Sequence, residues 1–434
     1  MLDNIAQKTL PNGLKVICLK KSDTPIVSVQ LWYKTGSFYE RDGIRGISHF
    51  LEHMMFRGTS WIKSEEHSGR ISELGGHCNA FTAEDVTAFF NSVPKDGLDM
   101  VLRLEADRMD GLLLDPDIFE AERGVLTEEY HTYMNNPVTK AFLEFRREFF
   151  GTYPYADSPL GRIEDTKSVT VDDCREYYHS FYVPQNANLV VVGDFESEER
   201  IFEKAQKWFG SKSGSVIKQS ADAAKFKHTQ KAHEMERRVD FDVPVLVCGF
   251  PAPHSSHKDA LPLEILQIVL SGGESGRLYR EMVRKKSIVI MVGGMNQMFR
   301  YAGMSMFFAI FTPDIPVSKV RAELGRQIDI VKKDGITAQE FQKVKNATLT
   351  NRTFELHSAE HIAQRIGYGE ALEGDYRLWV SRLDKLKHLN RDELVEAAVR
   401  YWDSSKMHSL YLKPQKVSPG LFVAGFFRRI FGRK

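Results

Sequence analysis

The chain of 434 residues contains an internal repeat. Residues 167–176 and 387–396 align at a constant offset of 220 positions. Each copy places a Thr or Asn three residues before an acidic side chain, an arrangement like the capping box that begins a helix. An aromatic pair follows in both copies, at 181–182 and 401–402, and a strand-like apolar segment comes next. The constant offset predicts two duplicated halves of about 200 residues each.

Within each half, strand-like apolar segments lie between segments with helical periodicity. Residues 14–20, 26–35 and 245–250 are examples of such strands. The pattern predicts an α+β fold in which helices are layered on an antiparallel-rich sheet, once in each half.

A segment rich in Lys, Ser, Ala and Gln separates the two halves and shows little periodicity. This composition predicts a linker over residues 211–235. We therefore expect a first domain over 1–210 and a similar second domain over 236–415. The remaining residues, 416–434, are aromatic and basic and predict a short amphipathic helix. Such a tail would lie on an anionic membrane or dock on a partner, and the alternatives are packing on its own domain or a frayed end.

Residues 49–53 read His-Phe-Leu-Glu-His and predict a metal site on one face of a helix. Positions i and i+4 of a helix lie one above the other and i+3 lies beside them, so His49, Glu52 and His53 converge. The pattern is an inverted zinc-binding motif, although a helix can also carry such residues on its solvated side. We expect Gly58 to end the helix. An apolar stripe on the opposite face would anchor it, formed by Ile47, Phe50, Leu51 and Met54.

A catalytic zinc ion needs a third protein ligand from elsewhere in the chain. Residues 115–117 read Asp-Pro-Asp, which predicts the start of a helix that carries Glu122 and Glu129 two turns apart on one face. One of these carboxylates would bind the metal while the other hydrogen-bonds a ligand or the substrate. Periodicity does not choose between them, and a solvated acidic face is the alternative for both.

These motifs resemble the pitrilysin and mitochondrial processing peptidase family of zinc endopeptidases, in its processing-peptidase-like bacterial form. The resemblance covers most of residues 8–415. It rests on four segments, namely 49–59, 75–82, 122–129 and 182–194.

The resemblance implies a role for each residue of the predicted metal site. His49 and His53 match the two histidine ligands of one zinc ion per chain, and Glu129 matches the third ligand. Glu52 matches the general base of peptide hydrolysis. Glu122 matches the acid that lies near the metal.

The resemblance also implies how a substrate binds. Asn79, Ala80 and Thr82 match an edge strand that pairs with the backbone of an extended peptide. The two domains are expected to face each other like a clamshell, an arrangement that favours unfolded or extended peptides over native proteins.

The second half departs from the family at two positions. Related enzymes carry an Arg, and a Tyr seven residues later, that bind substrate and stabilise the oxyanion. In ungapped register these positions fall on Val283 and Ile290, and Arg284 lies one residue out of register. Either other side chains substitute, or this chain is the zinc-bearing subunit of a dimer whose homologous partner supplies the pair. We favour the partner; pairing with a second copy of the chain stays open.

Composition excludes some classes of function. Hydrophobic residues make up 42% of the chain and charged residues 27%, and the net charge is only +1, so the composition gives no electrostatic reason to expect nucleic-acid binding. The sequence contains no run of about 18 apolar residues and no signal peptide at its beginning. We expect a soluble protein, in either the cytoplasm or the periplasm.

The four cysteines lie far apart and form no Cys-x-x-Cys pair, which favours free thiols over a disulfide framework. They are Cys18, Cys78, Cys174 and Cys248.

A rival function belongs to a different class. The same fold also serves as a non-catalytic assembly subunit or peptide-binding scaffold in related proteins. The intact zinc motif argues against this alternative, and stoichiometric zinc with chelator-sensitive cleavage of an unstructured peptide would discriminate between the two.

Overall fold

The computed structural model describes residues 4–214 and 232–415. Most of the predicted linker and the whole predicted amphipathic tail, 416–434, lie outside the described residues. The chain forms two compact units, each assembled from separate stretches of sequence. The first comprises Met1–Tyr130, Asp157–Ala221 and Asn351–Leu383, and the second His131–Ala156, Asp222–Thr350 and Asp384–Lys434.

The first unit is built on a six-stranded sheet. Its strands are β1 (Ala6–Thr9), β2 (Lys15–Lys20), β3 (Ile26–Tyr33), β4 (His77–Thr82), β5 (Thr87–Pro94) and β6 (Ala187–Gly193). They are ordered β1-β2-β6-β3-β5-β4. The β2–β6 pair is parallel and the other pairs are antiparallel, so the prediction of an antiparallel-rich sheet is confirmed.

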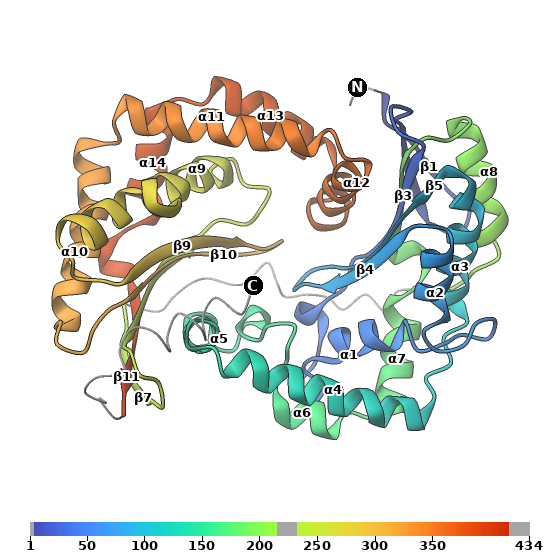
Figure 1. The fold of residues 1–434 in the computed structure, drawn as a ribbon, viewed down its shortest axis with the longest axis horizontal. Coiled ribbons are helices and arrows are strands. Elements are labelled where there is room, and N and C mark those ends of the chain that lie inside the picture. Colours follow the sequence, from blue (N-terminus) through green and yellow to red (C-terminus); the bar gives the residue numbers. More distant parts are fainter. Residues whose placement is uncertain (1–3, 215–231, 416–434) are drawn as a thin grey trace. The chain divides into compact units, whose positions relative to one another are not determined.

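Helices cover both faces of this sheet (Figure 1). Along β3, Val29 and Leu31 face one core, whereas Trp32 faces a second core that includes Ile362 and Ile366 of a helix from the second repeat. Burial on both faces explains why the neighbouring strand β6 is apolar at four successive positions, Leu189 to Val192. The second core contains residues of α12 (Ala359–Tyr368). The first core contains residues of five helices, namely α1 (Ile47–Met54), α3 (Leu98–Asp110), α4 (Pro116–Met134), α7 (Val171–Phe181) and α8 (Glu198–Phe209). The unit also includes α2 (Glu66–Glu73) and α6 (Ile163–Ser168).

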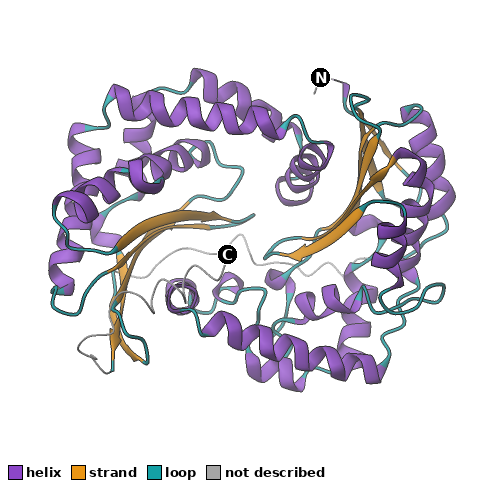
Figure 2. Cartoon of the chain, viewed as in Figure 1, coloured by secondary structure: helices purple, strands orange, loops and turns teal. Residues whose placement is uncertain are grey.

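The second unit repeats this plan around a five-stranded sheet. Its strands are β7 (Glu234–Val239), β8 (Val245–Ala252), β9 (Met291–Met298), β10 (Gly303–Ile310) and β11 (His408–Pro414), in the order β7-β11-β8-β10-β9. Only the β7–β11 pair is parallel. Figure 2 shows helices on both faces of this sheet as well. They are α5 (Pro137–Phe150), α9 (Ala260–Ser271), α10 (Val317–Asp334) and α14 (Arg391–Tyr401). Helices α11 (Ala338–Glu355) and α13 (Arg377–His388) each have residues in both units.

The predicted internal repeat is confirmed by equivalent elements in the two halves. Helices α7 and α14 have bounds that differ by the predicted offset of 220 residues, and both begin with a complete capping box. In the first the box pairs Thr170 with Asp173, and in the second it pairs Asn390 with Glu393. Each strand that follows, β6 or β11, pairs antiparallel with β3 or β8 respectively, and parallel with β2 or β7 on its other side.

The two repeats exchange one helix. α5 comes from the first repeat but contacts β8 and β11 of the second sheet, and α12 comes from the second repeat but contacts β3 and β6 of the first. The expected domains over 1–210 and 236–415 were continuous and did not include this exchange. An amphipathic pattern shows that a helix packs on a sheet but not which sheet it chooses.

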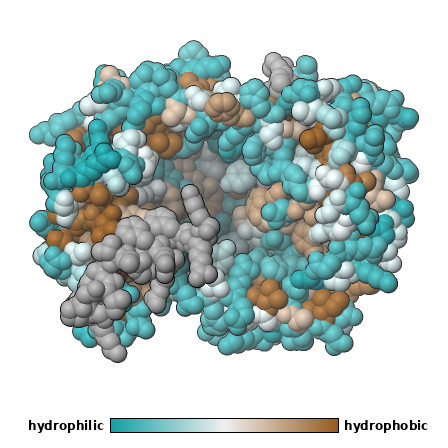
Figure 3. All heavy atoms as spheres, viewed as in Figure 1, coloured by the Kyte–Doolittle hydropathy of each residue, from teal (hydrophilic) through white to brown (hydrophobic). Residues whose placement is uncertain are grey.

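The surface visible in Figure 3 is mostly hydrophilic, with hydrophobic side chains in scattered patches. No helix among residues 4–214 and 232–415 is long and apolar enough to cross a membrane. All four cysteines are free thiols, as predicted. Burial raises the pKa of both Cys18 and Cys248 to about 12, so these thiols stay protonated.

Candidate metal centre

Helix α1 holds the His-x-x-Glu-His motif against the core of the first unit. Its predicted apolar stripe is buried, with Phe50 and Leu51 at most 1% exposed. The helix begins after Gly46, whose φ of 102° is a left-handed conformation that favours glycine. The carboxylate of Glu40 accepts hydrogen bonds from the backbone N–H groups of Gly46 (2.7 Å) and Ser48 (2.9 Å) and so caps the helix. α1 ends at Met54, earlier than the expected stop at Gly58.

Helix α4 begins as predicted and packs directly on α1. Asp115 accepts hydrogen bonds from the N–H groups of Asp117 and Ile118, which satisfies the first turn. Phe119 stacks on Phe50 of α1, with ring centroids 4.2 Å apart and planes inclined by 17°. This contact sets one helix against the other and turns the acidic face of α4 toward the two histidines.

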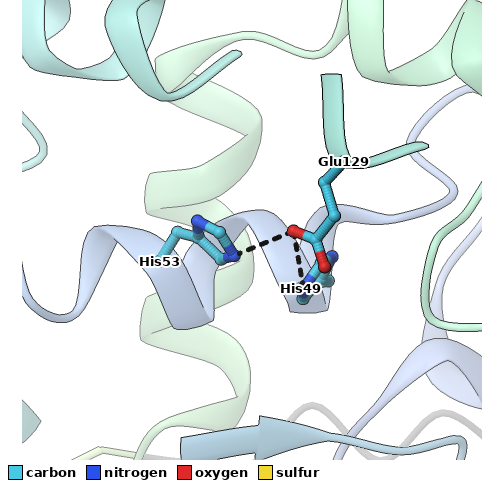
Figure 4. A group of neighbouring side chains, drawn as sticks. All are labelled: His49, His53 and Glu129. Carbon is cyan, nitrogen blue, oxygen red and sulfur yellow. Dashed lines mark ion pairs between the residues drawn. The ribbon is translucent and has the colours of Figure 1, made fainter. Parts of the chain in front are cut away.

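His49, His53 and Glu129 converge (Figure 4). Glu129 Oε2 lies 3.6 Å from His53 Nε2 and 3.9 Å from His49 Nε2. Two donors bound ~2.0–2.2 Å from a tetrahedral zinc ion are about 3.3–3.5 Å apart, so small side-chain movements would complete such a site. Two imidazole nitrogens and one carboxylate oxygen are also a ligand set that catalytic zinc uses. The residues present therefore fit a zinc ion.

Glu122, the second carboxylate on the predicted face of α4, lies beside a histidine rather than among the three converging ligands. Its Oε2 lies 3.2 Å from His53 Nδ1, the ring nitrogen that faces away from Glu129. Its Oε1 lies 2.7 Å from Nη2 of Arg57, which also forms an ion pair with Glu65. A carboxylate on the outer nitrogen of a ligating histidine sets the ring orientation and tautomer. Sequence reasoning missed Arg57, because no spacing signal separates it from other basic residues near the motif.

Glu52 projects from α1 beside the two histidines and accepts a hydrogen bond from the Thr82 hydroxyl at 2.6 Å. Burial raises the pKa of Glu52, and the bond from Thr82 opposes this shift. Burial, together with the neighbouring His53, lowers the pKa of His49 to about 4. His49 is therefore a neutral imidazole near pH 7, the form that binds metals.

The predicted substrate-binding residues lie on β4, an edge strand of the first sheet. Ala80 and Thr82 belong to the face that packs toward α1, whereas Asn79 lies on the opposite face. The side-chain oxygen of Asn79 accepts the hydrogen bond from the N–H of Ala80 (2.9 Å). The structure thus brings Thr82 to Glu52, and the contact of all three residues with substrate stays a prediction.

Val283 and Ile290 lie in the second unit and bear no polar side chain. Val283 is part of a π-helix, Tyr279–Lys285, and packs half-buried against the core of its unit. Ile290 donates its backbone N–H to the carbonyl of Ile310 at 2.7 Å. The neighbouring Arg284 forms an ion pair with Glu274. The structure therefore places neither an Arg nor a Tyr at the two positions.

Comparison with known proteins identifies the family of this chain. The family model "Insulinase (Peptidase family M16)" matches residues 15–160, which include both zinc-motif helices. The model "Peptidase M16 inactive domain" matches residues 168–348. The chain belongs to the insulinase family, peptidase family M16. Within it, the inactive-domain match begins after all five residues of the metal centre and includes Val283 and Ile290.

Several relatives of this chain are named zinc proteases. The zinc protease PqqE of Helicobacter pylori is 28% identical over 94% of this chain and 92% of its own length. The uncharacterized zinc protease YmxG of Bacillus subtilis is 25% identical over 90% and 94%. A crystal structure of a protease from Helicobacter pylori superposes with a TM-score of 0.89 at 27% identity, covering 95% of this chain and 99% of that one.

Proposed function

We propose that this insulinase-family chain is a zinc-dependent endopeptidase that hydrolyses extended or unfolded peptides. The observation that carries the proposal is the convergence of His49, His53 and Glu129 from two helices. Glu52, which accepts a hydrogen bond from Thr82, would be the general base, and Glu122, 3.2 Å from His53 Nδ1, would orient that ring.

Each residue of the centre has a distinct task in the proposed reaction. His49, His53 and Glu129 would hold one zinc ion, which when bound acidifies water and polarises a carbonyl. Glu52 takes a proton from the attacking water and returns it to the leaving amine.

The edge strand β4 supplies a surface for an extended peptide. One side of β4 pairs with β5, and no described strand pairs with the other side. A peptide that adds to this open side gains backbone hydrogen bonds whatever its sequence. Thr82, which contacts Glu52, places this strand next to the general base. Folded proteins would not offer a free strand to β4, so unfolded or extended peptides are the expected substrates.

Val283 and Ile290 support a further part of the proposal, that the chain is the zinc-bearing subunit of a dimer. Loss of an oxyanion donor costs about 10²- to 10³-fold in rate, so apolar residues at both positions leave a large deficit. A homologous subunit that carries the Arg and the Tyr would supply the missing stabilisation of the oxyanion. A homodimer would not, because both copies carry Val and Ile.

The experiment measures zinc content and peptide cleavage on the same sample. The purified chain is expected to contain one zinc ion and to cleave an unstructured peptide in a chelator-sensitive manner, faster with a homologous partner subunit. If the chain binds no zinc after gentle purification and after zinc is added, the proposal of a zinc-dependent endopeptidase is wrong. Bound zinc and peptide binding without cleavage, with or without the partner, would instead support a non-catalytic assembly or peptide-binding subunit.

A further inference from the structure

A solvent-open hollow lies on the side of the first sheet that faces away from α1. It has a volume of about 380 Å³, within the usual range of ligand pockets. It is lined by β3, β4, the end of α11 and the exposed side of α12. Its lining includes Trp32, Phe81, Glu355, His361, Arg365 and Tyr368.

We propose that this hollow is a subsite that binds an aromatic side chain of the peptide substrate. The inference rests on the proposed function, because it takes β4 as the strand that pairs with the peptide. It adds the chemical class of one substrate side chain and the residues that select it.

Strand register connects the hollow to the open side of β4. Trp32 and Phe81 both pair with Ala88 of β5, so the three side chains stand in a row on one face of the sheet. The small Ala88 lets the two aromatic rings meet edge to face across it, with centroids 5.5 Å apart. Phe81 is the last side chain of this row before the open side of the sheet.

Side-chain alternation directs part of a bound peptide into the hollow. A strand added to β4 would lie about 4.8 Å away and point successive side chains to opposite faces. Side chains level with Ala80 and Thr82 would face α1 and the metal centre. The side chain level with Phe81 would face α12 and extend the aromatic row. Neighbouring substrate residues would therefore enter different environments.

The lining chemistry favours an uncharged aromatic side chain. Trp32, Phe81 and Tyr368 present ring surfaces, and Tyr368 meets Trp32 edge to face with centroids 6.3 Å apart. The charge of Arg365 is already paired, because its Nε and Nη2 lie 2.9 and 2.6 Å from the Glu355 oxygens. An acidic substrate side chain would have to displace Glu355, whereas an aromatic ring only adds edge-to-face contacts.

The wall formed by α12 is held firmly in place. Ile362, Ala363 and Ile366 are fully buried in the second core, which leaves His361, Arg365 and Tyr368 on the exposed side of the helix. Gly367 permits the close approach to β3, since a Cβ there would lie 2.1 Å from Trp32 Nε1. A wall fixed in this way is preorganised for an aromatic side chain.

The test compares two unstructured peptides that differ only by Phe or Ala at one position, with that position scanned along the peptide. Binding is measured on zinc-loaded Glu52→Gln protein and cleavage on the active enzyme with its partner subunit. At one position the Phe peptide is expected to bind and react about tenfold better. Tyr368→Ala should abolish this preference without changing zinc content, and Tyr368→Phe should retain it. Phe354→Ala is the matched control, an exposed aromatic of the same unit outside the hollow.

The outcomes separate the subsite from the proposed function. A preference for Phe that Tyr368→Ala leaves intact would overturn the subsite, as would a preference for an acidic residue at that position or no binding of either peptide. The binding assay could instead show a preference for Phe that depends on Tyr368 while no zinc-loaded protein cleaves either peptide. That result would support the subsite and contradict the proposal that the chain is an endopeptidase.

Discussion

Glu122 connects His53 to Arg57, with Oε2 3.2 Å from His53 Nδ1 and Oε1 2.7 Å from Arg57 Nη2. The carboxylate is 5% exposed, so solvent cannot easily replace it. Its contact with Nδ1 leaves His53 Nε2 facing Glu129. The orientation of one predicted ligand thus depends on a residue that does not itself belong to the ligand set.

We expect Glu122→Gln to lower zinc affinity about 10- to 100-fold, because a neutral amide orients His53 less strongly than a carboxylate does. Competition with a chelator of known affinity measures the change. Glu120→Gln, an exposed position on the same helix, should bind zinc like the wild type. Equal zinc affinity in the Glu122 variant and the wild type would show that the contact has no positioning role.

The variants Glu52→Gln and Glu129→Gln should both lose peptidase activity, but for different reasons. Glu52→Gln is expected to keep zinc and to lower kcat about 10²- to 10⁴-fold, because the proton acceptor is lost while the ligands remain. Glu129→Gln should lose zinc itself, because a carboxylate ligand becomes a weak amide donor. Metal analysis and peptide cleavage on the same preparations separate the effects. Full activity in Glu52→Gln would refute the assigned mechanism.

Glu40 should make stability depend on pH. Burial raises its pKa from 4.5 to about 7, while its bonds from the N–H groups of Gly46 and Ser48 oppose the shift. Between these pH values the folded state binds a proton that the unfolded state has released. The contribution of Glu40 to the free energy of unfolding therefore falls as pH rises from 4.5 to about 7, by up to ~3 kcal/mol, and is constant outside that window.

Denaturant unfolding of the wild type and of Glu40→Gln across this range measures the effect. Subtracting one free energy of unfolding from the other removes the contributions of other titrating groups. The difference should change with the predicted sign within the window. A difference that is independent of pH would contradict the raised pKa, and one of opposite sign would indicate that capping of α1 lowers the pKa instead.

The apolar residues Val283 and Ile290 should limit the activity of the isolated chain. Val283→Arg combined with Ile290→Tyr is expected to raise kcat without a partner by about 10²-fold, because the pair restores stabilisation of the oxyanion. Val283→Gln combined with Ile290→Phe introduces side chains of similar size without the charge or the hydroxyl and should have no such effect. An equal gain in both double variants would mean that packing, rather than the missing donors, limits the rate.

Short-range features of this protein were predictable from sequence because they are set within a few residues of chain. The positions of His49, Glu52 and His53 follow from the pitch of one helix, and the caps at Asp115 and Thr170 follow from local hydrogen bonds. The duplicated halves were visible because equivalent helices and strands kept a constant spacing. Even here, α1 ended before Gly58, since helix ends respond to packing as well as to glycine.

The sequence by itself determined which residue types can form the metal centre and, through the family resemblance, which role each is expected to have. Only the tertiary structure shows how these residues lie relative to one another. Glu122 and Glu129 share one helix face, so their roles depend on where α4 contacts α1, which the stacked Phe50 and Phe119 decide. The exchange of α5 and α12 was likewise absent from the pattern, because an apolar stripe encodes burial but not its partner. The hollow beside β4 exists because that exchange brings α12 to the first sheet.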